Sequence, residues 1–444
     1  MTQLGFISIL RTTFDVNLAQ DMIQQARTLL MGAGYELLGR ADAITTLDEA
    51  RSAADELSAL APELVVVFQS TFADSTMVMA LAHAIDAPLL LWAVPEPHTG
   101  GRLRLNSLCG INLAGHALTR AHYRYGYVYA APDDPAVLHQ IGVYARAATA
   151  RHALRHARIG RVGENPSGFE TCLMDVGALK NRFGIEIVQV DLQETVFAQA
   201  RSAAPEQVSA AVEQLGQRVR DLDTLDQAGV NGTMGVYLTL QALAQREHLK
   251  GYSVRCWPEF FTELGCAACG AMSMLNDEQT PSSCEADVNG TITSLMLQSL
   301  SGEPAFGSDI VSLDKERDAL VLWHCGLAPL SMADDNEPPG VTIHSNRKMP
   351  LLMQFTLKPG IVTVARLSEA TGEYRLVIGR GEIVRAPRAF SGTSGHLRFE
   401  NGSSVVLDTL LREGLEHHIS MTYGDHVESL MVLAQMLNLP VLQL

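Results

Sequence analysis

The sequence contains no long hydrophobic segment. Its longest apolar runs, such as Pro88–Val94, have the length of a β-strand, whereas a membrane helix needs about 20 unbroken apolar residues. The opening MTQLGFISIL also lacks the basic segment and long apolar stretch that are typical of a signal peptide. Apolar residues make up 47% and charged residues 18% of the chain, which argues against disorder. We therefore expect a globular protein of the cytoplasm.

Basic residues are few. The chain has 33 Lys and Arg against 49 Asp and Glu, so its formal net charge is −16. A strongly acidic surface disfavours nucleic acids and anionic membranes as partners. It leaves a small ligand in a cleft as the expected partner, because a local site need not share the sign of the whole surface.

Cysteine is also scarce, with seven in 444 residues. An odd number spread thinly over a large chain fits a reducing compartment better than a disulfide framework. Cys266 and Cys269 have the C-x-x-C spacing, but no second cysteine pair accompanies them. We interpret both as small packing residues beside a site rather than as a redox or zinc motif.

Two nucleotide-binding patterns are missing. The loop at residues 163–168 contains glycines but not G-x-G-x-x-G, and Pro166 interrupts it. The phosphate loop G-x-x-x-x-G-K-[ST] does not occur. The sequence therefore disfavours ATP-driven chemistry and dinucleotide binding.

The first third of the chain alternates strand and helix patterns, and the length of 444 residues suggests about three domains. Strand, helix, strand, helix, strand is the signature of an open parallel sheet. The predicted elements, in chain order, are Leu4–Leu10, Asn17–Ala33, Thr46–Leu60, Leu64–Phe68, Thr76–Ile85 and Pro88–Val94.

A second parallel α/β domain is expected from residue 156. It opens with a strand at Arg158–Val162, continues with a strand at Ile185–Val190 and has a helix-rich stretch at Pro205–Glu247. The densest cluster of unusual residues follows, at Val254–Cys325. Ser282 or Ser283 is expected to cap a helix there.

The last 110 or so residues change character, because short strand-like runs are divided by Gly, Pro and Asn. They predict an antiparallel, barrel-like sheet with one closing helix. The expected strands are Val341–Phe355, Ile361–Leu367, Tyr374–Val384, His396–Phe399 and Ser404–Leu407, and the expected helix is Asp425–Leu437. The predicted fold is thus two Rossmann-like parallel-sheet domains, 1–155 and 156–330, followed by a β-rich domain, 331–444.

Polar residues follow the strands of the first domain and predict a ligand cleft. Ligands of open parallel sheets lie beyond the carboxyl ends of the strands. Arg11 and His98 stand at such ends, and Arg102 and Arg104 complete a small basic island. This island fits an anionic or polyhydroxy ligand and, equally well, an ordinary charged surface.

Three residues at strand or helix ends are candidate metal ligands, Glu259, Asp287 and His324, and His417 and His418 lie close to a turn in the last domain. Glu285 precedes Asp287 by two positions, and two residues that far apart on a helix point about 200° apart. We therefore expect Asp287 in the site and Glu285 in a capping or supporting role. Each residue alone also fits an ordinary structural role, such as a carboxylate beside a helix dipole.

The types of ligand limit the metal. Carboxylate oxygens with one or two imidazoles suit Mn²⁺, Co²⁺ or Mg²⁺ better than a closed structural zinc site.

The order of motifs resembles the L-fucose isomerase / L-arabinose isomerase superfamily. Two Rossmann-like units precede W-P-E at Trp257–Glu259, C-E-A-D-x-x-G at Cys284–Gly290, W-H-C-G at Trp323–Gly326 and a late His417-His418. The resemblance implies a Mn²⁺-dependent aldose–ketose isomerase. It also implies a homo-oligomer, a trimer, tetramer or hexamer, whose active sites are shared between neighbouring chains.

The resemblance also implies roles for individual residues. Glu259 is expected to bind metal and transfer the substrate proton, with Asp287 as the second ligand and acid/base partner. His324 and His418 are expected as further ligands, with His417 as the neighbour that could replace His418. The superfamily does not fix the sugar, which is expected to be a pentose, a deoxyhexose or an acidic hexose.

The chemistry requires groups of these types. Moving a carbonyl from C1 to C2 removes a weakly acidic proton through an ene-diolate, which a divalent cation stabilises and a carboxylate initiates. Apolar walls raise the pKa of one carboxylate relative to the other. Trp257, Trp323 and Phe260 are the expected walls, and both tryptophans are candidate substrate contacts.

Two other classes of protein remain open from the sequence. A sugar-binding protein without turnover also has two α/β units around a cleft, but needs neither a metal-ligand set nor a β-rich third domain. A metal-dependent lyase or hydrolase acting on a sugar would use the same ligand types.

Overall fold

The computed structural model describes residues 3–444 and divides the chain into two compact units. The first unit is Met1–His152 with Met431–Asn438, and the second is Ala153–Leu430 with Leu439–Leu444. Among the described residues, none of the helices combines the length and apolar character needed to cross a membrane.

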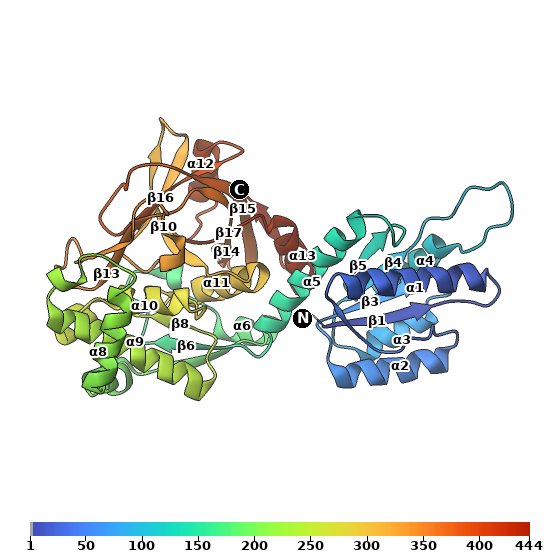
Figure 1. Cartoon of the computed structure of the whole chain (residues 1–444), viewed down its shortest axis with the longest axis horizontal. Helices are drawn as coiled ribbons and strands as arrows, with labels where there is room; N and C mark the ends of the chain where they lie inside the picture. The colour runs from blue at the N-terminus through green and yellow to red at the C-terminus, as the bar shows by residue number, and fades with distance from the viewer. Residues whose placement is uncertain (1–2) are drawn as a thin grey trace. The chain divides into compact units, whose positions relative to one another are not determined.

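The first unit is built on a five-stranded parallel sheet of order β2-β1-β3-β4-β5 (Figure 1). Apolar residues of the sheet pack into two separate cores, one on each face, which is why helices are needed on both sides. The predicted open parallel sheet is confirmed. Its strands are β1 (Gln3–Ile9), β2 (Glu36–Leu38), β3 (Leu64–Gln69), β4 (Leu89–Ala93) and β5 (Tyr125–Tyr129).

Local signals set the helix boundaries of this unit. The Asp15 side chain accepts a hydrogen bond from the Leu18 amide and starts the first helix, and Thr46 and Glu49 form a capping box at the second. These starts agree with the predicted helices to within one residue. The helices are α1 (Val16–Gly32), α2 (Leu47–Leu60), α3 (Thr76–Ala84), α4 (Ser107–Arg120) and α5 (Ala136–Leu154).

The second unit begins with a four-stranded parallel sheet of order β7-β6-β8-β9. The strands are β6 (Arg158–Val162), β7 (Glu186–Val190), β8 (Gly251–Val254) and β9 (Ser282–Ser283). This confirms the second predicted parallel sheet. The helices around it are α6 (Val176–Phe183), α7 (Ala198–Arg201), α8 (Pro205–Gly216), α9 (Gln227–Glu247), α10 (Ala268–Asp277) and α11 (Val288–Ser301).

A largely antiparallel sheet completes the second unit (Figure 1). Its strands run in the order β16-β11-β10-β17-β14-β15, and a pairing between β15 and β16 closes them into a barrel. The predicted barrel-like β region is confirmed. The barrel strands are β10 (Phe306–Asp314), β11 (Ala319–His324), β14 (Gly360–Ser368), β15 (Arg375–Val384), β16 (Thr393–Phe399) and β17 (His418–Tyr423).

The barrel draws on residues from both sides of position 330. Strands β10 and β11 precede that position, and the remaining barrel strands follow it. The division into three domains at 155 and 330 stays a prediction. Strands β12 (Gly340–Thr342), β13 (Leu352–Thr356) and β18 (Val441–Gln443) extend the sheet beyond the barrel.

Two predicted elements of this region are wrong. Ser404–Leu407 was expected as a strand but lies in helix α12 (Ser403–Arg412), because Gly402 ends the preceding turn and the apolar residues continue at helical spacing. The single strand expected at Val341–Phe355 is instead β12 and β13, separated by a loop. The closing helix is α13 (Val427–Leu437), close to its predicted range.

Close packing of α9 on α7 gives a test of this arrangement. A Cβ atom at Gly235, inside α9, would lie 2.6 Å from the backbone oxygen of Ala200 in α7. We expect Gly235→Ala to lower the free energy of unfolding by about 1–3 kcal/mol, because a backbone atom cannot move aside like a side chain. Chemical denaturation measures the change.

Gly216→Ala in α8 is the matched control. The new Cβ atom would meet only the Cδ2 of Leu222, at an ordinary 3.6 Å. Since alanine favours a helix over glycine, this variant should be as stable as the parent or more stable. Equal stability of the two variants would contradict the close helix contact.

Candidate active site

Three strands of the barrel place polar side chains in one row. Asp309 on β10 lies directly opposite His418 on β17 and Trp323 on β11. Residues directly opposite each other in antiparallel strands project from the same face of the sheet. The register therefore brings together side chains that are about 100 residues apart in sequence.

Glu285 reaches the same place from the parallel sheet. It lies in the loop between β9 and α11, where Glu285 and Ala286 adopt left-handed backbone conformations with φ of 60° and 55°. A disulfide joins Cys284 to Cys256, which follows the neighbouring strand β8. The expectation that no disulfide staples the chain is thus wrong for this pair, because the parallel pairing of β8 and β9 sets the two loops side by side.

The bridged loops carry two cavity residues. The Trp257 indole N–H, next to Cys256, donates a hydrogen bond to Glu285 Oε1 at 3.3 Å. This contact fixes one carboxylate oxygen of Glu285 and leaves the other, Oε2, facing the barrel.

Two carboxylates and two imidazoles converge at this point, and we call them the carboxylate–imidazole cluster: Glu285, Asp309, His417 and His418. His417 Nε2 lies 3.0 Å from Glu285 Oε2 and 4.0 Å from Asp309 Oδ1. His418 Nε2 lies 3.8 Å from Glu285 Oε2 and 3.3 Å from Asp309 Oδ1. Each imidazole thus points its Nε2 at both carboxylates.

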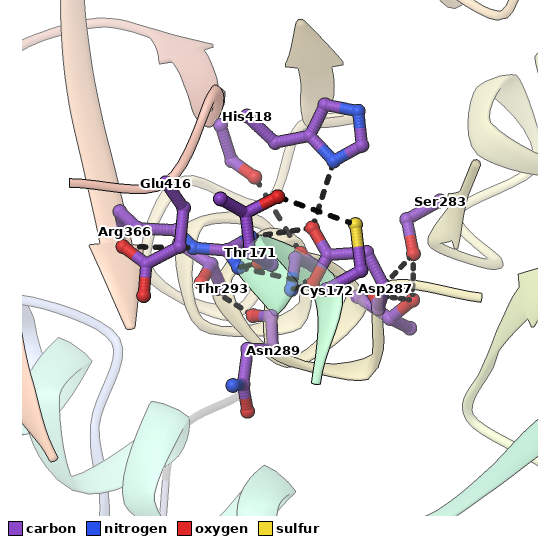
Figure 2. A network of polar contacts seen from close by, with 12 residues as sticks. Thr171, Cys172, Ser283, Asp287, Asn289, Thr293, Arg366, Glu416 and His418 are labelled. Atoms are coloured by element: carbon purple, nitrogen blue, oxygen red, sulfur yellow. Dashed lines mark hydrogen bonds and ion pairs between the residues drawn. The ribbon is translucent and has the colours of Figure 1, made fainter. Parts of the chain in front are cut away.

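The Nδ1 atom of each histidine contacts a second residue on the side away from the two carboxylates. His417 Nδ1 lies 2.8 Å from the Thr171 hydroxyl, and His418 Nδ1 lies 2.9 Å from Asp287 Oδ2. Figure 2 shows the His418 ring with one nitrogen bonded to Asp287 and the other turned away. An ionised carboxylate only accepts hydrogen bonds, so His418 Nδ1 carries the proton of this contact. His418 Nε2 then keeps a lone pair that is directed toward the cluster.

Asp287 is fully buried and serves several partners at once. Both of its oxygens accept hydrogen bonds from the Arg366 guanidinium on β14, at 2.5 and 3.0 Å (Figure 2). Its Oδ1 accepts a further hydrogen bond from the Gly290 amide. Burial raises the pKa of Asp287, but the Arg366 charge and the His418 contact outweigh burial and lower it overall.

The helix start differs from expectation. Asp287 caps α11, and neither Ser282 nor Ser283 does, because both serines belong to strand β9. The structure therefore gives Asp287 a supporting position behind His418 and brings Glu285 forward into the cavity. The expected ligand role of Asp287 stays a prediction.

The structure does not bring Glu259 into the cluster. Both of its oxygens lie 2.9 Å from Arg255 Nε, and its side chain lines a separate cavity with residues of the 163–164 and 189–193 segments. Burial raises the pKa of Glu259, but its hydrogen bond to Arg255 and its own backbone outweigh this and lower it. Its role as the proton-transferring base stays a prediction from the resemblance.

A cavity of about 130 Å³ opens beside the carboxylate–imidazole cluster. Trp257 and Trp323 line it, together with His324, whose ring centroid lies 6.3 Å from that of His418. His324 Nδ1 contacts Cys325 Sγ at 3.3 Å, and both residues line the cavity. His324 therefore lies in the wall of this cavity. Phe260 is buried in the core, and its neighbour Phe261 lines the cavity instead.

The candidate substrate residues of the first domain all lie in the first unit. Arg11 forms an ion pair with Asp74. Arg104 is 2.8 Å from Asp15, and Arg102 is 3.7 Å from the same carboxylate. His98 is exposed.

Sequence reasoning missed Asp309, Arg366 and Thr171. Asp309 stands in a strand-like segment, where a charged side chain is expected to face solvent. Its meaning appears only when the strand register sets it opposite His418. Arg366 gave the one signal in the sequence, because it stands within the predicted strand Ile361–Leu367, where burial of its charge would require a partner. In the structure its side chain is 2% exposed and pairs with Asp287.

Two parallel α/β sheets, a β-barrel and a cavity of facing carboxylates and imidazoles define the class: an α/β protein with an acid–base site. Two family models match the chain: "Fucose/sulfoquinovose isomerase, N-terminal domain" over residues 5–155, and "L-fucose isomerase, C-terminal domain" over residues 353–444. The chain belongs to the fucose/sulfoquinovose isomerase family, and it is an enzyme of the aldose–ketose isomerase type.

Relatives named as sulfoquinovose isomerases cover nearly the whole chain. A sulfoquinovose isomerase of Alkalicoccus urumqiensis is 32% identical over 99% of this chain and 98% of its own length. A sulfoquinovose isomerase of Priestia aryabhattai is 30% identical, again over 99% of this chain and 98% of its own length. The resemblance drawn from the motifs is thereby confirmed.

A solved structure gives a much weaker likeness. An ABC transporter periplasmic solute binding protein of Actinobacillus succinogenes 130z, with bound D-allose, aligns with 68% of this chain and 93% of its own. The identity is 12% and the TM-score 0.18, so this likeness bears on neither fold nor function.

The buried pair of Arg366 and Asp287 gives a stability test. Arg366→Met would leave the Asp287 charge buried without its main partner, so we expect a loss of about 3–5 kcal/mol in the free energy of unfolding. The double variant Arg366→Met/Asp287→Asn should recover part of this loss, because it removes the unpaired charge. Urea denaturation of the parent and these two variants measures both changes in the free energy of unfolding.

The exposed pair of Arg51 and Asp48 serves as a control, since its side chains are 65% and 92% exposed. Arg51→Met should change stability little, because solvent screens such a pair. If Arg366→Met were as mild as this control, Asp287 would not depend on Arg366.

Proposed function

We propose that this enzyme converts a sulfonated aldose, sulfoquinovose, into its ketose with the help of one divalent cation. The observation that carries the proposal is the carboxylate–imidazole cluster, in which Nε2 of both His417 and His418 faces Glu285 Oε2 and Asp309 Oδ1 within 3.0–4.0 Å. The curated relatives named as sulfoquinovose isomerases support the choice of sugar.

The cluster fits a cation on its own chemistry. The Nδ1 contact to Asp287 gives neutral His418 a lone pair on Nε2, and this lone pair faces two carboxylates. Asp309 Oδ1 is buried and accepts no hydrogen bond within residues 3–444. Such an arrangement requires either a protonated imidazole or a cation at its centre.

Two oxygens and two nitrogens suit Mn²⁺ first, with Co²⁺ or Mg²⁺ as alternatives. Glu285, Asp309, His418 and His417 would hold the ion, whereas Asp287 and Thr171 would orient the two imidazoles. When bound, the cation supplies positive charge that stabilises the negative charge developing on the substrate oxygens.

The carboxylates of the chain carry the proton transfers. We propose that Glu285 removes the proton from C2 of the open-chain aldose and returns it to C1, while Asp309 accepts the O2 proton and delivers one to O1. Atoms balance, because the ketose differs from the aldose only in where these two protons lie. The Trp257 contact at Glu285 Oε1 holds the base in place for both transfers.

The oligomeric state and the cellular location belong to the same proposal. We propose a homo-oligomer with shared active sites, either a trimer, tetramer or hexamer, on the strength of the family resemblance, and we propose that it works in the cytoplasm. The proposed chemistry requires the sugar and the cation, and neither a nucleic acid nor a membrane.

The first test combines metal and sugar. With Mn²⁺ and sulfoquinovose the purified enzyme should form the ketose, as followed by ¹H NMR, and chelation followed by dialysis should abolish turnover until Mn²⁺ is restored. Asp309→Asn should weaken Mn²⁺ binding about 10–100-fold or more, because it removes one charged ligand. Full activity after verified removal of all metal would overturn the metal-dependent mechanism.

A second test identifies the base. Glu285→Gln should lower kcat by about 10²–10⁴-fold, the usual contribution of a positioned proton-transfer group. Glu259→Gln is the competing variant, because the resemblance assigns the same role to Glu259. Loss of turnover in Glu259→Gln with unchanged Mn²⁺ binding, and normal rates in Glu285→Gln, would move the base to Glu259.

A further inference from the structure

The cavity beside the carboxylate–imidazole cluster also has a basic wall. Arg347 and His344, from the loop between β12 and β13, line the same cavity as Glu285 and Asp309. Trp257 connects the two sides, since its indole N–H bonds Glu285 and its ring face lies 4.7 Å from the Arg347 guanidinium carbon. The anionic and cationic groups are thus separated by about one indole.

Arg347 is positioned by aromatic rings rather than by a carboxylate. Its guanidinium lies over Trp257 at 4.7 Å and over Phe261 at 5.1 Å. Within residues 3–444 it forms no ion pair, although the chain has an excess of acidic residues. Stacking restrains the plane of the guanidinium and leaves its N–H groups along the edge unused.

His344 adds a second donor. Its Nδ1 accepts the backbone N–H groups of Asn346 and Arg347, each at 3.3 Å, and its ring packs edge-on against Phe261. Burial and the neighbouring Arg347 charge lower the pKa of His344. The neutral ring therefore carries its proton on Nε2, where it can donate.

The loop itself is closed by its backbone. The His344 amide donates to the Met349 carbonyl, and the Lys348 amide donates to the His344 carbonyl, both at 2.8 Å. This turn fixes Arg347 relative to His344 before any ligand arrives, so little order has to be gained on binding.

We propose that Arg347, assisted by His344, binds the sulfonate group of the substrate and sets its orientation in the cavity. This rests on the proposed function, which supplies the sulfonated sugar. A sulfonate offers three oxygens to the planar donor edge of arginine, which suits such anions better than a lysine does. The reacting carbons then lie toward the carboxylate–imidazole cluster and the anion lies away from it.

Arg102 and Arg104, which the sequence suggested as binding residues for an anion, are less suited to this role. Both lie beside the Asp15 carboxylate, at 3.7 and 2.8 Å. A paired guanidinium has to give up or share its partner before it binds a second anion. Arg347 has no such competitor among the described residues.

The experiment compares Arg347→Met, Arg347→Lys and the control Lys348→Met. Lys348 is the next residue of the same loop and does not line the cavity. With sulfoquinovose, Arg347→Met should raise KM about 10- to 100-fold, the usual loss for hydrogen bonds to a charged group, and change kcat less. Arg347→Lys should fall between, and Lys348→Met should match the parent.

A neutral sugar shows whether the effect concerns the anion. Binding of D-glucose, measured by calorimetry, should be unchanged in Arg347→Met, while binding of sulfoquinovose weakens. Equal weakening for both sugars would show a general packing role and overturn the proposal. Unchanged sulfoquinovose binding in Arg347→Met, or a selective loss in Arg102→Met instead, would overturn it too.

Calorimetry also separates this inference from the proposed function. If the parent binds sulfoquinovose through Arg347 but does not isomerise it, the anion site stands and the proposed reaction fails. If the parent isomerises sulfoquinovose and Arg347→Met does so with the same KM, the reaction stands and the anion site fails. If the parent neither binds nor converts it, both fail.

Discussion

The site depends on one buried ion pair, between Asp287 and Arg366. Asp287 caps helix α11, one of the helices around the parallel sheet of the second unit. Arg366 lies on barrel strand β14 and His418 on barrel strand β17, and both contact Asp287. A charge buried without its partner costs several kcal/mol, so these elements hold one another in place. The orientation of His418, and with it the direction of Nε2 into the cavity, follows from this pair.

The same pair explains the most distinctive motif in the sequence, C-E-A-D-x-x-G. The Gly290 amide donates a hydrogen bond to Asp287 Oδ1. A Cβ atom at position 290 would lie 2.5 Å from Asp287 Oδ2 and 3.1 Å from Arg366 Nη1. Glycine is required at this position because the carboxylate and guanidinium occupy the space of a side chain. The motif therefore encodes the support of the site, and within the motif Cys284 and Glu285 line the cavity.

The sequence predicted most regular elements, and from it we expected Asp287 in the site with Glu285 in support. In the structure Glu285 lines the cavity and Asp287 lies behind His418. Apolar runs were enough to predict strands β1, β3 and β4 of the first parallel sheet. They gave no signal for β9, whose two residues are serines. The choice between Glu285 and Asp287 assumed that both lie on a helix. The helix begins at Val288, and the left-handed backbone at Glu285 and Ala286 turns the two side chains in ways that no helical angle describes.

Asp309 was beyond sequence reasoning for a different reason. Its importance comes from strand register, which depends on pairings between β10, β11 and β17 that are far apart in the chain. Arg347 is a similar case, because a charged residue in a polar turn carries no signal until the rings of Trp257 and Phe261 are found beneath it.

The proposed binding of a sulfonated sugar at this acidic site would face an electrostatic conflict. The carboxylates of Glu285 and Asp309 repel a sulfonate, and the net charge of −16 adds to this at long range. The proposed cation among the carboxylates and the proposed sulfonate contact of Arg347, across the indole of Trp257, would resolve the conflict locally. The two charges also favour one orientation of the sugar, because the reversed one would set the sulfonate against the carboxylates.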